Sequence, residues 1–412
     1  MPHRAMRALP RRRITALFAA GAVAAFGIAG AAGASTATKA TGKPVKVVVI
    51  LDESESQGLR FDTARAGIKA KAKAINSGDG LGGSGRPVQV EYCVTELDPN
   101  KDAECARKAA DDPNVVAVVG SVIGFGDSVN PILQGAGLPN VGGTAFSQSD
   151  GLNPIVFPVM GGLVAAVGCQ ASILADKAGA KKISVAYSDT PGAELGAVLA
   201  DQTLKPRNLS VNNKAVVPLG KADISAEVTA IAEGSDGIVT ASDGGTAKKI
   251  IRTVRQLGLD VAIAGSGAQQ FTPAALKSLG DAGNGVYLAL WFATDDTKAP
   301  GVKEYLAAMK KVGATGKSDD LAKNSWLALG LLDRAAQGQT TIDRASILSS
   351  LQGISDFKTG GLTPTIDYTQ PGSFFGGAQP RVVNDSCAYG KIKNGKIVAA
   401  GKGFVDPFQP PA

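Results

Sequence analysis

Several loops of small polar residues follow predicted β-strands in this sequence, and they carry the groups that hold small molecules: hydroxyls, carboxylates, amides and backbone N–H groups. Ligands in open parallel sheets lie beyond the carboxyl ends of the strands, so these loops could together surround a ligand without covalent chemistry. The alternative is that Ser, Gly and Asp only form turns there. The loops are 52–57 (DESESQ), 121–127 (SVIGFGD), 142–149 (GGTAFSQS), 188–192 (SDTPG), 242–245 (SDGG) and 265–270 (GSGAQQ).

The candidate ligand-binding residues come from these loops and from one aromatic position after a later strand. The acids of DESESQ favour a cationic or amide-rich ligand, or else they only stabilise the N-terminus of the next helix. Phe125, Phe146 and Trp291 could offer aromatic faces to a ligand, although core packing is the commoner role for Phe. The full set is Glu53, Ser54, Ser121, Gly124, Phe125, Thr144, Phe146, Ser147, Asp189, Ser242, Asp243, Gln269 and Trp291.

Catalytic, metal and cofactor chemistry is disfavoured by what the sequence lacks. His3 is the only histidine, and it lies in a predicted export signal, so the mature chain has no imidazole for a Ser-His or Cys-His nucleophile or for a His-ligated metal site. No GxSxG motif is present either. We therefore expect no catalytic residue, no metal and no cofactor; an enzyme that uses Asp189 or Asp243 as a base is the least favoured alternative.

Two glycine-containing stretches match nucleotide-binding loops only in part. GDGLGG (78–83) fits GxGxxG, but it lies after a helix and before a strand, the reverse of the dinucleotide fingerprint. The loop at 121–127 has the right order of strand, loop and helix, but it lacks the third glycine and a Walker lysine. We interpret this second loop as one that holds a small solute by backbone amides and small side chains.

The first 34 residues have the pattern of an export signal: a basic segment without acids, an apolar segment rich in Ala and Gly, and a small-x-small cleavage site ending at Ala34. An uncleaved membrane anchor is the alternative, and the arginines of PRRRIT leave the twin-arginine route open beside general secretion. Removing five arginines from the 43 basic residues leaves 38 against 36 acids, a net charge of +2, which does not favour nucleic acid as a partner.

The four cysteines form an even set in an exported chain, which favours disulfides over reactive thiols or zinc ligands. Three pairings are possible, and buried free thiols are the alternative to all of them. Cys93 at the end of a strand and Cys105 in the following helix are close in sequence, so we expect them to pair, which leaves Cys169 with Cys387. No cysteine lies near the cleavage site, so no lipid attachment is expected.

Strands and helices alternate along the rest of the chain, as in α/β proteins with parallel sheets. VKVVVIL (45–51) is a continuous β-branched run, as expected for a strand covered on both faces. The number of strands implies two sheets, and the length of 412 residues favours two domains. The further predicted strands are 87–94, 115–120, 181–188, 215–219, 236–242, 261–265 and 285–293, with a hairpin at 387–401. The predicted helices are 58–76, 99–112, 127–134, one after Pro191, 224–232, 246–257, 273–279, 301–311, 321–337 and 343–351.

The order of several motifs resembles the extracytoplasmic solute-binding proteins of the leucine/isoleucine/valine type, which serve ABC transporters. The resemblance covers 45–398 and rests on the sequence of these motifs along the chain. They are NVVAVVG with its Gly/Ser loop, GLPNVGGTAFS, AGAKKISVAYSDTPGAELG, DGIVTASDGGTAKKIIRTVRQLGLD, DAGNGVYLALWF and GKIKNGKIV.

The resemblance implies a type I periplasmic-binding fold, in which two Rossmann-like lobes are joined by three crossings and close on a ligand by a hinge. By analogy the crossings fall near 157–161, 285–292 and 361–368. After the signal (1–34) and a linker (35–43), lobe 1 would be 44–157 plus 290–360, and lobe 2 would be 158–289 plus 361–412.

At the positions of the family's ligand contacts this chain has other residues. Ile123 and Gly124 replace a Ser pair, Phe146 replaces a Thr, and Gly192 replaces a Tyr. Gly267 stands where the family has an acid that pairs with the ligand's ammonium group, and Asp243 is the nearest substitute. The expected function is therefore a monomeric, exported receptor that delivers an amino acid, amide or amine-like solute to an ABC permease, free or held at the cell envelope. A ligand sensor that signals to a protein partner is the alternative.

Overall fold

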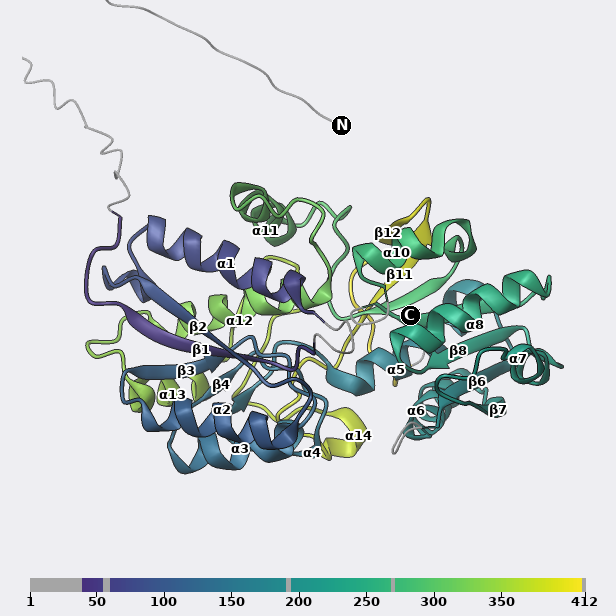
Figure 1. Ribbon diagram of the computed structural model, residues 1–412, viewed down its shortest axis with the longest axis horizontal. Helices are drawn as coiled ribbons and strands as arrows, with labels where there is room; N and C mark the ends of the chain where they lie inside the picture. Colours follow the sequence, from purple (N-terminus) through teal and green to yellow (C-terminus); the bar gives the residue numbers. More distant parts are fainter. Residues whose placement is uncertain (1–38, 55–59, 190–193, 268–270, 410–412) are drawn as a thin grey trace, which may run out of the picture. The chain divides into compact units, whose positions relative to one another are not determined.

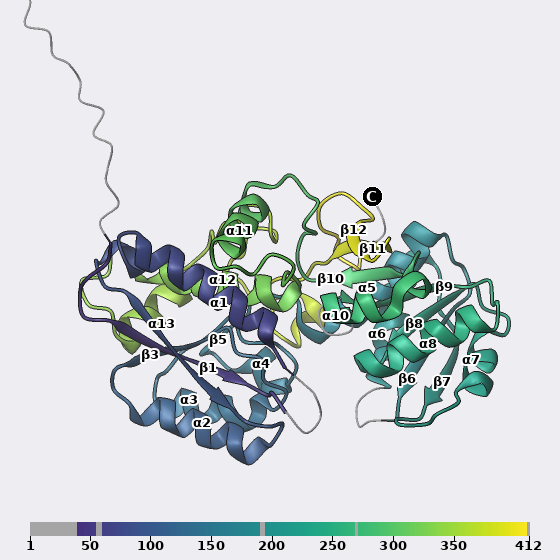
Figure 2. The same ribbon diagram turned by 45° about the horizontal axis from the view of Figure 1, so that its top comes forward.

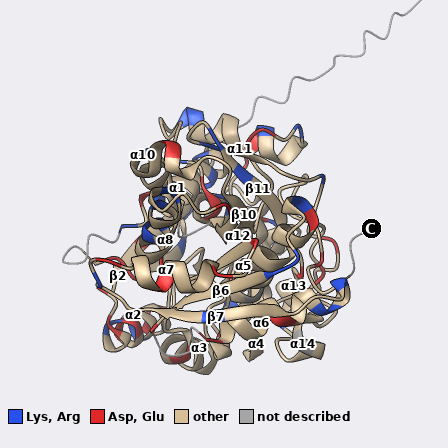
Figure 3. Ribbon diagram, turned by 90° about the vertical axis from the view of Figure 1, so that its right-hand side faces the viewer, with Lys and Arg blue, Asp and Glu red and all other residues tan. Residues whose placement is uncertain are grey.

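The computed structural model describes residues 39–54, 60–189, 194–267 and 271–409, all of which lie in the compact unit Ala37–Ala412. The predicted export signal, Gly192 and the candidate site residue Gln269 lie outside the described residues. Within the described part, no helix is long and apolar enough to cross a membrane. Both signs of charge are distributed over the helices (Figure 3).

The first sheet is five-stranded and parallel, in the order β2-β1-β3-β4-β5. Its strand β1 is buried along almost its whole length, which is what its β-branched sequence predicts. The strands are β1 (Val45–Leu51), β2 (Val88–Val94), β3 (Val115–Val119), β4 (Asn140–Val141) and β5 (Val156–Phe157).

Helices cover both faces of this sheet (Figure 1). On one face α1 (Asp62–Ser77) packs against α12 (Asp320–Ala336) and α11 (Pro300–Lys311), and α13 (Arg344–Gln352) packs against α12 and β3. On the other face α2 (Pro99–Asp111) packs against α3 (Gly126–Gly135), which contacts the short helix α4 (Gln148–Leu152). Because these strands are parallel, the carboxyl ends of β1, β3 and β4 lie at the same edge of the sheet.

The second sheet is seven-stranded, in the order β12-β11-β10-β9-β8-β6-β7. Its pairs from β7 to β10 are parallel, and the hairpin β11–β12 joins β10 in antiparallel orientation. Asn394 (φ 51°) and Gly395 (φ 68°) form the predicted turn of this hairpin. The strands are β6 (Ile183–Ser188), β7 (Val211–Val217), β8 (Gly237–Ala241), β9 (Ala262–Ser266), β10 (Tyr287–Leu290), β11 (Ala388–Lys393) and β12 (Lys396–Ala399).

Helices also pack on both faces of the second sheet. The side chains of α7 (Ser225–Ala232), α8 (Gly244–Gln256) and α10 (Pro273–Leu279) form one apolar cluster with the strands. The opposite face packs against α5 (Gly162–Ile173) and α6 (Leu195–Leu204), whose apolar side chains join a continuous core with the α1 and α12 face of the first sheet. The four-residue helix α14 (Phe374–Gly377) precedes the hairpin.

The three segments expected to cross between lobes lie side by side. The hydroxyl of Tyr368 donates to the carbonyl of Pro158 at 2.9 Å, and its ring meets Phe157 edge-on at a centroid distance of 5.4 Å. The N–H of Ala293 donates to the carbonyl of Leu362, also at 2.9 Å. The chain segments near 157, 292 and 365 are thus bonded to one another between the two sheets.

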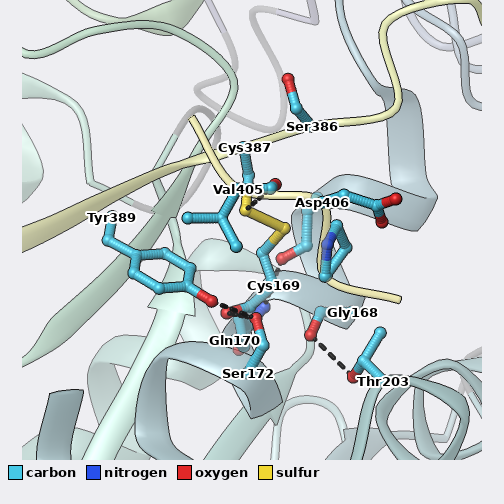
Figure 4. Close-up of a disulfide and its surroundings, with 12 residues drawn as sticks. Gly168, Cys169, Gln170, Ser172, Thr203, Ser386, Cys387, Tyr389, Val405 and Asp406 are labelled. Atoms are coloured by element: carbon cyan, nitrogen blue, oxygen red, sulfur yellow. Dashed lines mark hydrogen bonds between the residues drawn. A yellow bond between two sulfur atoms is a disulfide. The ribbon is translucent and has the colours of Figure 1, made fainter. Parts of the chain in front are cut away.

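Both expected disulfides are confirmed. Cys93–Cys105 ties β2 to α2, and Cys169–Cys387 ties α5 to the segment before β11, across 218 residues of sequence. Next to the second bond, the hydroxyl of Tyr389 contacts that of Ser172 at 2.8 Å (Figure 4).

Several predicted element boundaries were wrong. The helix expected from position 58 begins at Asp62, the strand expected at 285–293 covers only Tyr287–Leu290, and β7 begins at Val211, before the expected 215. The strands β4 and β5 were not predicted, because they are two residues long and carry no periodic signal, and α5 was not predicted either. α5 is apolar around its whole circumference because it is packed on several sides, so it shows no 3.6-residue alternation.

Candidate functional site

The loops after β1 and β3 are tied together by the carboxylate of Asp52, which is buried. One of its oxygens accepts a 2.6 Å hydrogen bond from the backbone N–H of Gly124, and the other accepts one of the same length from the hydroxyl of Thr95. Gly124 and the next residue, Phe125, remain exposed. A buried acid therefore holds an exposed turn at the carboxyl end of β3.

Two of the candidate hydroxyls are used to fix this turn. The side chain of Ser121 is fully buried, and its oxygen accepts from the N–H of Ile50 at 2.9 Å. The hydroxyl of Thr144 accepts from the N–H of Ile123 at 3.0 Å and lies 3.1 Å from the carbonyl of the same residue. Both side chains therefore position the backbone of the turn, and what a ligand can reach there is the main chain of Gly124 and Phe125 and the ring of Phe125.

The loop after β4 packs closely on the same turn. Ser147 caps α4, and the buried carboxylate of Asp150 accepts from the N–H groups of Phe146 (3.1 Å) and Ser147 (2.9 Å). A Cβ added at Gly126 would lie 2.4 Å from the hydroxyl oxygen of Ser147, so only glycine fits there. Burial raises the pKa of Asp150 above its usual value, although these hydrogen bonds oppose the shift.

An aromatic pair joins this loop to the segment after β10. The rings of Phe146 and Trp291 are tilted, with centroids 5.8 Å apart. The indole N–H of Trp291 donates to the carbonyl of Gly162 at 2.9 Å, and its backbone N–H donates to the carboxylate of Asp320, also at 2.9 Å. The structure thus brings two predicted site residues from distant parts of the chain into contact, with Trp291 almost completely buried.

A buried polar group on α12 was not predicted to belong to this region. Burial raises the pKa of Asp320 to about 7, although Lys323 nearby opposes the shift. The ammonium group of Lys323, itself buried, binds the carbonyl of Ala293 and a carboxylate oxygen of Asp295, each at 2.9 Å. Two acids and a lysine in DDLAKNSWLALGLL, in an otherwise apolar helix, were the sequence signal for this group.

The acid Glu53 is engaged within the protein. Its carboxylate forms an ion pair with Arg65, with the closest approach 2.5 Å, and accepts from the N–H of Phe61 at 2.9 Å. Burial opposes its ionisation, but these bonds outweigh burial and hold the pKa of Glu53 below its usual value. The neighbouring Ser54 is buried.

A second buried acid lies beside Asp52. The side chain of Asp102 on α2 is completely buried, and no donor among the described residues reaches either of its oxygens. Burial, followed by interaction with the carboxyl group of Asp52, raises the pKa of Asp102 to about 8. The raised pKa favours the neutral, protonated form of Asp102 in the folded protein. Asp102 was not among the predicted site residues, because its position in the helix pattern also suits an exposed acid.

The remaining described candidates lie at the carboxyl ends of β6 and β8. Asp243 caps α8 by accepting from the N–H groups of Gly245 (2.7 Å) and Thr246 (3.0 Å), and its second oxygen lies 3.4 Å from the hydroxyl of Ser188. Burial opposes its ionisation, but these hydrogen bonds hold its pKa below the usual value. Ser242 precedes it in the turn, and exposed Asp189 accepts from the N–H of Leu219 at 2.9 Å.

Within the described residues, the site thus consists of two groups. The first combines the ends of β1, β3 and β4 with Trp291, and the second combines the ends of β6 and β8. Its exposed groups are the backbone of Gly124 and Phe125, the ring of Phe125 and the carboxylates of Asp189 and Asp243, which suit reversible binding of a small polar molecule.

Comparison with known proteins agrees with this architecture. The family model described as periplasmic binding protein matches residues 44–378. No curated protein matches the sequence.

Solved structures with the same fold share little sequence identity with this chain. The branched-chain amino acid transporter substrate-binding protein of Streptococcus pneumoniae, in complex with isoleucine, has a TM-score of 0.70 at 20% identity and covers 87% of this chain and 98% of its own. A solute-binding protein of R. palustris, in complex with 4-hydroxybenzoate, has a TM-score of 0.71 at 20% identity, with coverages of 88% and 97%.

A fatty acid ABC transporter substrate-binding protein of Thermomonospora curvata has a TM-score of 0.72 at 15% identity, covering 90% of this chain and 95% of its own. At these identities the likeness shows the fold, with two α/β lobes built on mainly parallel sheets. The family model covers most of the chain, and on that ground this chain belongs to the periplasmic binding protein family.

Proposed function

We propose that this protein is an exported receptor that captures a small polar solute of the amino acid, amide or amine class and delivers it to an ABC permease. The observation that carries the proposal is the exposed turn Gly124–Phe125, which the buried side chains of Asp52, Ser121 and Thr144 hold in place. A binding turn that is ordered before the ligand arrives loses less conformational entropy on binding, which favours affinity.

The acids around the site support a ligand with donor groups. Asp243 is exposed and ionised, and Asp320 lies behind the aromatic pair. Proteins with this fold have been solved with isoleucine and with 4-hydroxybenzoate, so the fold itself does not select one ligand class. An ammonium or amide N–H would complement the carboxylate of Asp243.

We further propose that 44–157 with 290–360 and 158–289 with 361–412 act as two lobes, monomeric in solution, that close over the solute. The contacts among the segments near 157, 292 and 365 support a hinge there, since such closures turn on a few residues at the ends of elements. Residues 1–34 would direct export, after which the mature chain works outside the cytoplasm.

A thermal-shift screen of the mature chain, residues 35–412, tests this proposal. The panel would hold amino acids, amides, amines, polyamines, short peptides and sugars. A ligand at 100 times its dissociation constant adds about 2.7 kcal/mol to the free energy of unfolding, which is easily seen as a higher Tm. We expect a hit among molecules with an ammonium or amide group, and a smaller radius of gyration by X-ray scattering when it is bound.

The variant Asp243→Asn should weaken binding of that hit, whereas Asp260→Asn, at an exposed acid before the amino end of β9, should leave it unchanged. If the whole panel leaves Tm and scattering unchanged, the receptor proposal is wrong.

A further inference from the structure

The outer edge of the first sheet is formed by β2, and half of its backbone groups point away from the sheet. In the parallel pair with β1, Val45 is the partner of Val88, so the residues at odd positions of β2 bond to β1 and those at even positions face outward. The side chain of Asn76 pairs with both backbone groups of Val88, at 2.7 and 2.9 Å. Within the described residues, the outward N–H and C=O groups of Val90, Tyr92 and Val94 have no hydrogen-bond partner.

A groove of about 640 Å³ runs beside this edge. Its floor is formed by the side chains of Val88, Val90 and Tyr92 on β2, and its walls by α1 and the turn after α11. The helices α1 and α11 pack together (Figure 2). The ring of Tyr92 is 39% exposed, and the guanidinium of Arg65 lies 4.5 Å from its centroid. The ion pair of Arg65 with Glu53 keeps this wall in place.

The groove carries an excess of positive charge. Exposed Lys69 and Lys73 follow one another along α1, and exposed Lys317 faces them from the turn after α11. Of these, Lys73 donates to the carbonyl of Lys311 at 3.0 Å, which leaves its charge unbalanced. Among the described residues, neither Lys69 nor Lys317 forms an ion pair. Asp62 is the one acid in the lining, and it lies 3.7 Å from Arg60.

We propose that this edge and groove bind an extended acidic segment of a partner protein, which adds to the sheet as a further strand beside β2. Strand addition would satisfy the open backbone groups of Val90, Tyr92 and Val94. Side chains on a strand alternate between its faces, so every second residue of the segment would lie over the groove. Glu or Asp at those positions would meet Lys69, Lys73 and Lys317.

A second copy of this chain fits the site poorly. Pairing β2 with β2 across a twofold axis would bring two sets of unbalanced lysines together, which is unfavourable. The proposed partner is therefore a different protein, and the site is separate from the solute-binding turn.

The proposal can be tested with a dye-labelled peptide of alternating Glu and Val that matches the seven residues of β2. Fluorescence anisotropy should show saturable binding to the mature chain, with a peptide of alternating Lys and Val bound at least tenfold more weakly. Hydrogen exchange should slow at the amides of Val90, Tyr92 and Val94 when the Glu–Val peptide is present, whereas amides that already bond to β1 should change little.

Two protein variants distinguish the contribution of the lysine charges to peptide binding from that of the backbone hydrogen bonds. Lys69→Glu with Lys317→Glu should weaken binding of the Glu–Val peptide at least tenfold, while Lys277→Glu on α10, an exposed lysine outside the groove, should not. Val94→Pro removes an outward N–H from an exposed edge residue and should also weaken binding. Neither groove variant should change the thermal shift produced by a solute, which keeps this test apart from that of the proposed receptor function.

Backbone N-methylation of the peptide gives a second test that does not depend on how Val94→Pro folds. We expect the methylated peptide to lose binding because it cannot form the ladder. Equal binding of the methylated peptide would show attraction by charge alone and would overturn strand addition. Equal binding of the Lys–Val peptide, no binding at millimolar concentration, or a dimer of the chain that Val94→Pro dissociates would overturn it as well.

Discussion

The carboxylate of Asp52 accepts a 2.6 Å hydrogen bond from the backbone N–H of Gly124, so that a buried acid at the end of β1 fixes the exposed turn after β3. The turn cannot be held by its own short sequence, because glycine has more backbone freedom than any other residue. The turn is held instead by hydrogen bonds that connect the carboxyl ends of β1, β3 and β4. Substitutions at buried positions should therefore change solute binding without touching the solute.

The first prediction concerns Asp52→Ala. Removing this carboxylate frees the N–H of Gly124 and takes an acceptor from the buried hydroxyl of Thr95, and an unsatisfied buried group costs about 1–3 kcal/mol. We expect a lower free energy of unfolding in urea and a solute affinity at least tenfold weaker by calorimetry. The exposed acid Asp260 provides the matched control, since Asp260→Ala should change neither quantity. Unchanged affinity in Asp52→Ala would show that the turn orders itself.

The second prediction follows from the pKa of Asp102, which burial and the nearby Asp52 raise to about 8. In the unfolded chain this carboxyl releases its proton near pH 4. Between about pH 4 and pH 8 the folded state therefore binds more protons than the unfolded state, and the free energy of unfolding falls as the pH rises. The fall has an upper limit of about 1.4 kcal/mol per pH unit for one proton.

Asp102→Asn should remove this contribution and make the protein more stable than the wild type at pH 8. Urea unfolding at intervals from pH 5 to pH 8.5 measures it. Asp319 and Asp320, with pKa values of about 6 and about 7, act in the same direction in both proteins, so they cancel in the difference, which should widen as the pH rises toward pH 8. If the free energies of unfolding of the wild type and Asp102→Asn changed in parallel with pH, the raised pKa of Asp102 would be contradicted.

The fold was largely predictable because most strands are long buried runs and most helices have one apolar face. The described parts of the predicted loops also lie where expected, at the carboxyl ends of strands. What the sequence could not show is which polar groups become buried. In sequence, Ser121 and Thr144 resemble ligand contacts. In the structure both are buried, and their hydroxyl oxygens accept hydrogen bonds from backbone N–H groups. Asp102 and Asp320 look like ordinary helix acids, and their role depends on packing between elements distant in sequence.

The third prediction concerns Gly162, at the start of α5. Its φ of 60° is unfavourable for other residues, and an added Cβ would lie 2.5 Å from the carbonyl oxygen of Ala145. Gly162→Ala should lower the free energy of unfolding by about 2–4 kcal/mol, through the backbone conformation and the steric overlap together. Gly220 has a φ of 73° with no atom within 4 Å of an added Cβ, so Gly220→Ala should lose only about 1 kcal/mol. Similar losses in the two variants would mean that the overlap relaxes freely.

The fourth prediction compares the two disulfides. A cross-link restricts the unfolded chain more when it closes a longer loop, and the loop-entropy relation gives about 5 kcal/mol for Cys169–Cys387, with a separation of 218 residues, and about 3 kcal/mol for Cys93–Cys105, with a separation of 12. Replacing both members of each pair by Ala should therefore lower stability more for the long bond.

The long bond also holds α5 next to the segment before β11, where both cysteines are fully buried (Figure 4). Urea unfolding of the two double-Ala variants, with m-values compared to detect a change in the unfolded state, measures the difference. Equal losses would contradict an entropic origin, because they would mean that local packing rather than loop length sets the contribution of each bond.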